Sequence, residues 1–129
     1  MFPRRAVAAL TLGAYLRLMS LADYQRSAAR TGNPALTPDD RLLDAAAGLA
    51  EEAGEILARI RKHRFQQRAL DRDVLVTELG DALWCLAMVA TSLDVTLEEV
   101  AERNIAKLRA RYPDGFSSAA ARDRADEPR

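Results

Sequence analysis

Histidine and cysteine are almost missing from this sequence, since the chain of 129 residues holds one of each. A single cysteine excludes an intrachain disulfide and a zinc site built on several cysteines. A single histidine argues against metal sites that need two or more imidazoles. Aromatic residues make up only 5% of the chain. Because alanine and leucine dominate instead, the composition favours helices over sheets.

An excess of charge of one sign is also missing. Lys and Arg together number 19, as do Asp and Glu, so the formal net charge is zero. Bulk charge therefore gives no reason to expect a nucleic acid or a membrane surface as a partner. Residues 1–18 place a short apolar run after Arg4 and Arg5. That run is too short to span a bilayer and resembles a signal peptide only faintly, so we interpret it as an N-terminal extension of a cytoplasmic protein.

Apolar residues recur at helical spacing through most of the chain. The pattern predicts four helices, over residues 20–31, 39–63, 71–93 and 96–111. The third is apolar nearly all round, which is typical of a helix buried on more than one side. We therefore predict an all-α bundle of four to five helices, completed by oligomerisation.

The ends of the chain differ in composition from this helical part. Residues 19–117 are predicted to form one domain. Residues 118–129 contain no large apolar side chain. Without such side chains a segment has little to bury, so we predict a flexible C-terminal tail.

Two pairs of acidic residues fall on the two longest predicted helices. Glu52 and Glu55 form one pair and Glu78 and Asp81 the other. Residues three apart lie on one side of a helix. Ionised carboxylates on a helix with apolar surroundings need a cationic partner, because burying them alone is costly. A divalent metal could serve all four, and ligands that are all oxygen favour Mg²⁺, Mn²⁺ or Ca²⁺. The alternative is that each pair is a solvated surface group paired with arginine.

Each acidic pair encloses a glycine, Gly54 in the first and Gly80 in the second. Glycine inside a helix is unfavourable relative to alanine. Either the two helices pack closely at these positions, or the glycines leave room for a metal or a phosphate near the backbone. The sequence alone does not separate these accounts.

Candidate substrate-binding residues lie on three of the predicted helices. Asn104, Lys107 and Arg111 share one side of the fourth and resemble a phosphate clamp, although basic residues also favour the last turn of any helix. Lys62, with Arg59, is a weaker phosphate candidate. Trp84 follows Asp81 by three residues and either stacks on a base or fills the core.

In this order, the two acidic motifs resemble those of the MazG-like nucleotide pyrophosphohydrolases. That family is marked by Glu-x-x-Glu followed by Glu-x-x-Asp, here Glu52-x-x-Glu55 and Glu78-x-x-Asp81, separated by 22 residues. Residues 24–25 and 104–116 also resemble the family, and the whole match covers residues 19–117.

The resemblance implies Mg²⁺-dependent hydrolysis, with Mn²⁺ as a substitute, of a nucleoside triphosphate to the monophosphate and pyrophosphate. It implies attack of water at the α-phosphorus, and a homodimer or homotetramer whose sites lie between subunits. A role in clearing non-standard nucleotides is a further expectation from the family. The resemblance implies metal ligation by Glu52, Glu55, Glu78 and Asp81, a catalytic role for Glu55 and also for Glu51, and phosphate binding by Asn104, Lys107 and Arg111.

Three alternatives stay open. A phosphoribosyl-ATP pyrophosphohydrolase would share the fold and the reaction. A non-catalytic sensor would bind a nucleotide or metal without releasing pyrophosphate. A plain helical interaction module would show no stabilisation by Mg²⁺.

Overall fold

The computed structural model describes residues 19–124. Within this range the chain forms helices and no strand, so the all-α prediction is confirmed. The expectations for residues 1–18 and 125–129 fall outside the described residues. The helices are α2 (Leu21–Ala29), α3 (Pro38–Gln66), α4 (Arg72–Ser92), α5 (Leu97–Arg111) and α6 (Ser118–Asp123).

Polar caps set where the first four of these helices begin. Ser20 forms a capping box at α2, and Thr37 caps α3 just before a proline at its first position. Asp71 and Thr96 cap α4 and α5, each by accepting a bond from a backbone N–H three residues later. Such bonds satisfy donors that the helix itself leaves free. Because these signals are local, the four predicted helices agree with the observed ones to within a few residues.

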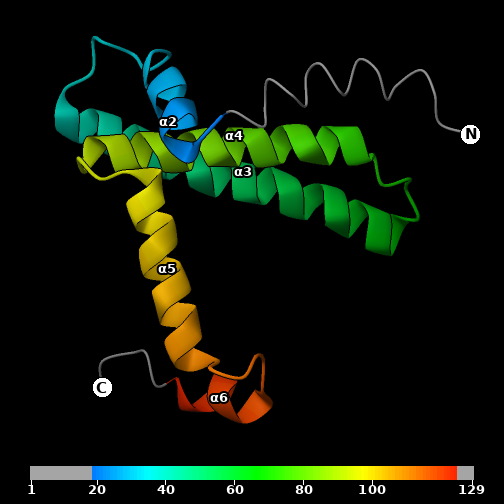
Figure 1. The fold of residues 1–129 in the computed structure, drawn as a ribbon. Helices are drawn as coiled ribbons and strands as arrows, with labels where there is room; N and C mark the ends of the chain where they lie inside the picture. Colours follow the sequence, from blue (N-terminus) through cyan, green and yellow to red (C-terminus); the bar gives the residue numbers. More distant parts are fainter. Residues whose placement is uncertain (1–18, 125–129) are drawn as a thin grey trace, which may run out of the picture.

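Helices α3 and α4 form a long antiparallel hairpin, and α2 lies across α4 near one end of it (Figure 1). The hairpin is closely packed where Gly48 faces Cys85, because a Cβ added to Gly48 would lie 3.0 Å from the Cys85 Sγ atom. The packing of α2 against α4 is made possible by three buried alanines, which are Ala28 of α2 and Ala87 and Ala90 of α4. Small side chains therefore permit both close approaches.

Gln25 ties α2 to the turn that leads into α5. Its amide nitrogen donates to the Val95 carbonyl at 2.9 Å, and its amide oxygen accepts from the Leu97 N–H at 2.8 Å. The Glu98 carboxylate accepts from the Ala22 N–H at 2.5 Å. These bonds hold the start of α5 against α2, and the rest of α5 projects away from the α3–α4 hairpin (Figure 1).

The core of the single chain is made mainly of small side chains, and large apolar residues stay exposed. Val76, Leu79, Leu83 and Leu86 follow one another at helical spacing along α4, and we call them the apolar stripe. Leu79 is 57% exposed and Val76 59%. The α3 and α2 sides of α4 are covered, as expected, whereas no residue of the described range 19–124 covers the apolar stripe. Within residues 19–124 the buried apolar residues are Ala28, Ala45, Cys85, Ala87, Met88, Ala90 and Leu97.

By length and composition alone, α4 could cross a membrane. It carries Glu78 and Asp81 within its length and packs along α3, which is strongly charged. Ionised side chains in a spanning helix are costly unless they face a polar interior. We therefore interpret α4 as the apolar central helix of the bundle.

Residues 118–123 differ from the expected tail, because they form the short helix α6. Ser117 caps it by accepting from the Ala120 N–H at 3.0 Å, and three consecutive alanines follow. No residue of α6 is buried. The lack of large apolar side chains led to the expectation of a tail without structure, but a cap and a high helix propensity support a short helix locally. The domain boundaries at 18 and 117 stay predictions.

Candidate functional site

The α3–α4 hairpin brings together three of the four predicted metal ligands. Glu52 of α3 meets Glu78 and Asp81 of α4, and one carboxylate oxygen from each lies within 4.8 Å of the others. We call these three residues the acidic triad. Glu52 and Glu78 are half-buried, and Asp81 is exposed. The i, i+3 spacing puts the two α4 residues side by side, and the hairpin supplies the third from the facing helix.

Crowding of negative charge is visible at Glu52. Partial burial, and then the charges of Asp81, Glu78, Glu55 and Glu51, raise the pKa of its carboxyl. Each of these effects disfavours the ionised form. A divalent cation would reverse this balance, and a donor set that is all carboxylate oxygen fits Mg²⁺ or Mn²⁺. The acidic triad therefore fits the metal that the sequence predicts.

Glu78 has a cationic partner in the same chain. The Arg59 Nη2 and Nε atoms lie 2.6 and 2.7 Å from the Glu78 Oε1 atom. Pairing of the acids with arginine, the alternative drawn from the sequence, is thus observed for one member of the acidic triad. Within residues 19–124 neither Glu52 nor Asp81 makes an ion pair. One guanidinium leaves the three carboxylates with a net negative charge.

The ion pair between Arg59 and Glu78 was not predicted, although the sequence carries a signal for it. Arg59 follows Glu55 by four residues and Glu52 by seven. Both spacings put Arg59 on the same side of α3 as the acids. What the spacing cannot supply is the register of α4, which decides that Glu78 is the residue opposite.

Glu55 and Glu51 are exposed and lie outside the acidic triad. Glu55 lines a pocket at the end of α3, and Glu51 lines a different one beside Trp84. Both are close enough for their charges to raise the pKa of Glu52. Glu51 and Glu55 therefore flank the acidic triad, in positions from which their carboxylates could accept a proton from a bound water.

Trp84 both packs and lines a pocket. Its Nε1 atom donates to the Thr31 Oγ1 atom at 2.7 Å, and its ring packs against the buried cluster of α2 and α4. It also borders a pocket of about 320 Å³ that reaches Glu52 and Asp81 of the acidic triad. The two interpretations of Trp84 from the sequence are therefore compatible.

Cys85 lies on the floor of the same pocket and is buried. Burial, and then the negative charges of Glu52 and Asp81, raise the pKa of its thiol. Because the thiolate is the reactive form, this thiol is kept in its unreactive state. We assign Cys85 to packing against Gly48.

The predicted phosphate clamp of α5 is not brought to the acidic triad by one chain. Asn104 and Lys107 are exposed on the part of α5 that projects away from the hairpin (Figure 1). The Arg111 guanidinium lies over the ring of Tyr112, 5.9 Å from its centre. The spacing places the three residues along one helix, but the direction of α5 depends on contacts with α2.

Gly54 and Gly80 face open space within the described part of the chain. A Cβ added at either position would meet no atom within 4 Å. Close packing of α3 on α4 therefore does not explain these two glycines. It does explain Gly48, which faces Cys85. The space beside Gly54 and Gly80 is open to a bound group or to a second chain.

Comparison with known proteins gives the chain its family. Residues 42–116 match the MazG nucleotide pyrophosphohydrolase domain. The chain belongs to this family. The matched stretch holds both acidic motifs of this MazG domain, the hairpin that joins them and all of α5. The resemblance inferred from the sequence is confirmed.

Two similar proteins cover the same region. The Gene 37 protein of Mycobacterium phage L5 is 40% identical over 72 residues, which span 53% of this chain and 63% of that protein. The uncharacterised protein YpjD of Bacillus subtilis (strain 168) is 39% identical over 75 residues, which span 55% of this chain and 67% of that protein. The match thus covers a little less than two thirds of the phage relative. No solved structure matches the chain.

Proposed function

We propose that this MazG-family protein hydrolyses a nucleoside triphosphate, NTP or dNTP, to the monophosphate and pyrophosphate. The observation that carries the proposal is the convergence of Glu52, Glu78 and Asp81 from two facing helices. A cluster of carboxylates without enough cations is unfavourable by itself and becomes favourable with a divalent metal. Membership of a nucleotide pyrophosphohydrolase family supports the same reaction.

Glu52, Glu78 and Asp81, with Glu55 beside them, would hold Mg²⁺ or Mn²⁺. When bound, the ion would neutralise phosphate oxygens and stabilise the charge that develops on the leaving group. The protein's part is to set the ligands on rigid helices. The two helices that carry the ligands, α3 and α4, pack closely against each other at Gly48.

Cleavage requires water to attack the α-phosphorus. The oxygen of water bonds to that phosphorus, the bond to the oxygen bridging to the β-phosphorus breaks, and pyrophosphate leaves with the electron pair. One proton of the water passes to a carboxylate, for which exposed Glu55 and Glu51 beside the acidic triad are suited. The products are the monophosphate and pyrophosphate.

The pocket beside Trp84 is proposed to receive the nucleoside, since its indole offers a flat apolar face next to the acids. Asn104, Lys107 and Arg111 would reach the phosphates of a site in a second copy of the chain, because they lie away from the acidic triad of their own chain. The uncovered apolar stripe of α4 supports a homodimer or homotetramer. We expect a soluble cytoplasmic protein with no nucleic acid or membrane partner.

The proposal is tested by release of pyrophosphate from a panel of NTPs and dNTPs, with Mg²⁺ and with EDTA. We expect Mg²⁺-dependent release together with the monophosphate. Glu55→Gln and Asp81→Asn should abolish release while circular dichroism shows an unchanged helix content. Full turnover in both variants would contradict the assignment of the acids. Release from phosphoribosyl-ATP alone would keep the chemistry and change the substrate.

A further inference from the structure

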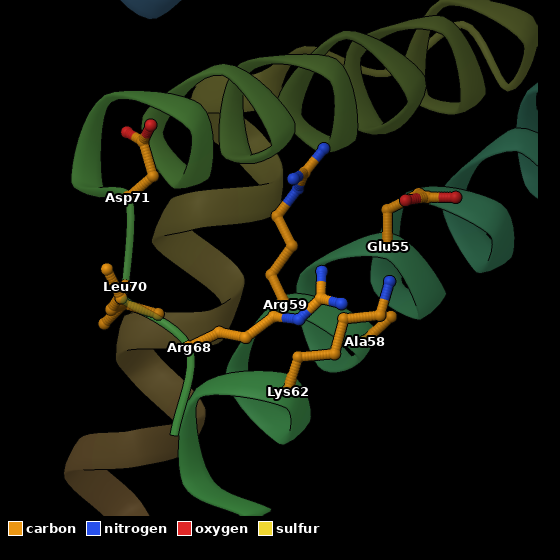
Figure 2. A pocket seen from close by; sticks show the side chains of 8 residues that line it. Glu55, Ala58, Arg59, Lys62, Arg68, Leu70 and Asp71 are labelled. Atoms are coloured by element: carbon orange, nitrogen blue, oxygen red, sulfur yellow. The ribbon is translucent and has the colours of Figure 1, made fainter. Parts of the chain in front are cut away.

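Positive charge gathers in a pocket at the far end of α3. Arg59 and Lys62 line it from α3, and Arg68 lines it from the connector that leads to α4. Figure 2 shows their side chains between the end of α3 and the start of α4, with Glu55 at the same opening. We call these three residues the basic cluster. The pocket measures about 270 Å³.

Local backbone structure explains how Arg68 comes to lie beside Lys62. Gln67 ends α3 in the left-handed conformation, with φ 52°, and its N–H bonds to the Lys62 carbonyl. This is a common way to close a helix and turn the chain. The His63 Nδ1 atom lies 2.7 Å from the Arg68 carbonyl oxygen. Since a carbonyl oxygen only accepts, Nδ1 carries the proton and holds the turned connector against α3.

Two members of the basic cluster lack a counter-ion. Within residues 19–124 neither Lys62 nor Arg68 makes an ion pair, whereas Arg59 pairs with Glu78. The carboxylate of Asp71, at the rim of the pocket, accepts from the Val74 N–H as the cap of α4. Among the residues that line the pocket, three cations face the two carboxylates of Glu55 and Asp71, so positive charge is in excess. An anion placed there would gain charge-assisted hydrogen bonds from several donors at once.

The pocket's position and charged lining indicate which anion it takes. The pocket lies next to the acidic triad. Glu55 lines the pocket and is also one of the carboxylates that raise the pKa of Glu52. Arg59 lines the pocket and pairs with Glu78 of the acidic triad. The lining of the pocket includes three cations, whereas neither Lys nor Arg lines the pocket beside Trp84. The pocket beside Trp84 lies nearer the other end of α3, beyond Glu52. A nucleoside fits that pocket better, and a compact polyanion fits the basic cluster.

We infer that Arg59, Lys62 and Arg68 bind the pyrophosphate group, as the β- and γ-phosphates of the substrate and as free pyrophosphate after cleavage. The place of this step in the reaction rests on the proposed function. Binding of free pyrophosphate does not, because it requires no turnover. The substrate then lies along the α3–α4 seam, with its nucleoside at Trp84 and its terminal phosphates at the basic cluster.

Calorimetric titration of the full chain with inorganic pyrophosphate, in EDTA, tests the inference. Lys62→Gln and Arg68→Gln should each weaken binding about tenfold, the effect of one lost hydrogen bond to a charged group. Arg61→Gln and Arg64→Gln are matched controls, since both are exposed at the same end of α3 and line no part of the pocket. The controls should bind as the unaltered chain does. Titration with a nucleoside monophosphate should not respond to any of the four changes.

The outcomes separate this inference from the proposed reaction. Loss of pyrophosphate binding in Lys62→Gln and Arg68→Gln alone supports the site, even if no nucleotide in the panel is hydrolysed. Equal weakening in the controls would mean that only the overall charge of α3 matters, and would overturn the site. Unchanged binding in all four variants would also overturn it, whether or not the chain releases pyrophosphate from nucleotides.

Discussion

The Arg59 guanidinium pairs with the Glu78 carboxylate, with 2.6 Å between Nη2 and Oε1. A metal ion that uses Glu78 as a ligand must therefore compete with an arginine of the same chain. The Arg59 side chain is 42% exposed and that of Glu78 12%. Solvent therefore reaches the pair mainly from the Arg59 side and weakens it there. This relationship links the state of the acidic triad to the basic cluster, because Arg59 belongs to the basic cluster and pairs with Glu78 of the acidic triad.

Removing the competitor should strengthen metal binding. We expect Arg59→Gln to bind Mn²⁺ or Mg²⁺ up to about fivefold more tightly, from the value of a partly exposed ion pair. Calorimetry with each metal measures this, and Arg61→Gln serves as the control because it changes the same charge away from Glu78. Weaker metal binding in Arg59→Gln would show that the guanidinium supports the site.

Glu52→Gln should stabilise the metal-free fold at neutral pH and remove its response to Mg²⁺. Burial and neighbouring carboxylates raise the pKa of Glu52, so the folded state holds that proton more tightly than the unfolded state does. Ionised Glu52 therefore costs stability above its pKa, and the cost disappears as the pH falls below the unfolded value. Thermal unfolding at several pH values, with EDTA and with Mg²⁺, checks both parts. A variant less stable than the original in EDTA at neutral pH would contradict the assignment.

Charge placed on the apolar stripe of α4 should break the proposed assembly. We expect Leu79→Glu and Leu83→Glu to run as monomers in size exclusion with light scattering, because ionised side chains are poorly tolerated inside an apolar interface. Thr77→Glu adds the same charge on the same helix, about 200° away from Leu79 at 100° per residue. It should leave the assembly intact. Monomers of the unaltered chain at high concentration would refute the assembly itself.

Alanine should act differently at the two glycines of α3. Gly54→Ala should stabilise the fold by up to about 1 kcal/mol through helix propensity, since a Cβ there meets nothing within 4 Å. Gly48→Ala should gain less or lose stability, because its Cβ would lie 3.0 Å from the Cys85 Sγ atom. Urea denaturation of both variants measures the difference. A loss at Gly54 would mean that another chain fills the space beside it.

Local signals allowed the helices to be predicted, and the arrangement of the helices limited the prediction of the site. Caps such as Ser20 and Thr96 act within one turn, so the helix starts followed from the sequence. Glu78 and Asp81 lie on one helix, so their proximity also followed. The meeting of Glu52 with them required the α3–α4 hairpin, whose short charged connector made it the simplest arrangement.

Other features depended on contacts that spacing does not contain. The direction of α5 depends on the bonds that Gln25 makes to Val95 and Leu97, some 70 residues away in sequence. The connector that carries Arg68 has no helical periodicity, and the left-handed Gln67 turns the chain back toward Lys62. In both cases a single side chain or a single backbone angle decides where a charged group ends up.

The core of small side chains has a consequence for how this protein responds to dilution. Alanine gains little free energy from burial, and many of the large apolar side chains are exposed in the single chain, so they would add to stability only in the proposed assembly. Stability in the proposed assembly therefore follows mass action, so the unfolding midpoint should climb with protein concentration. If the proposed assembly and activity hold, the chain at low abundance would be both less folded and less active per molecule, and its concentration in the cell would then set its output.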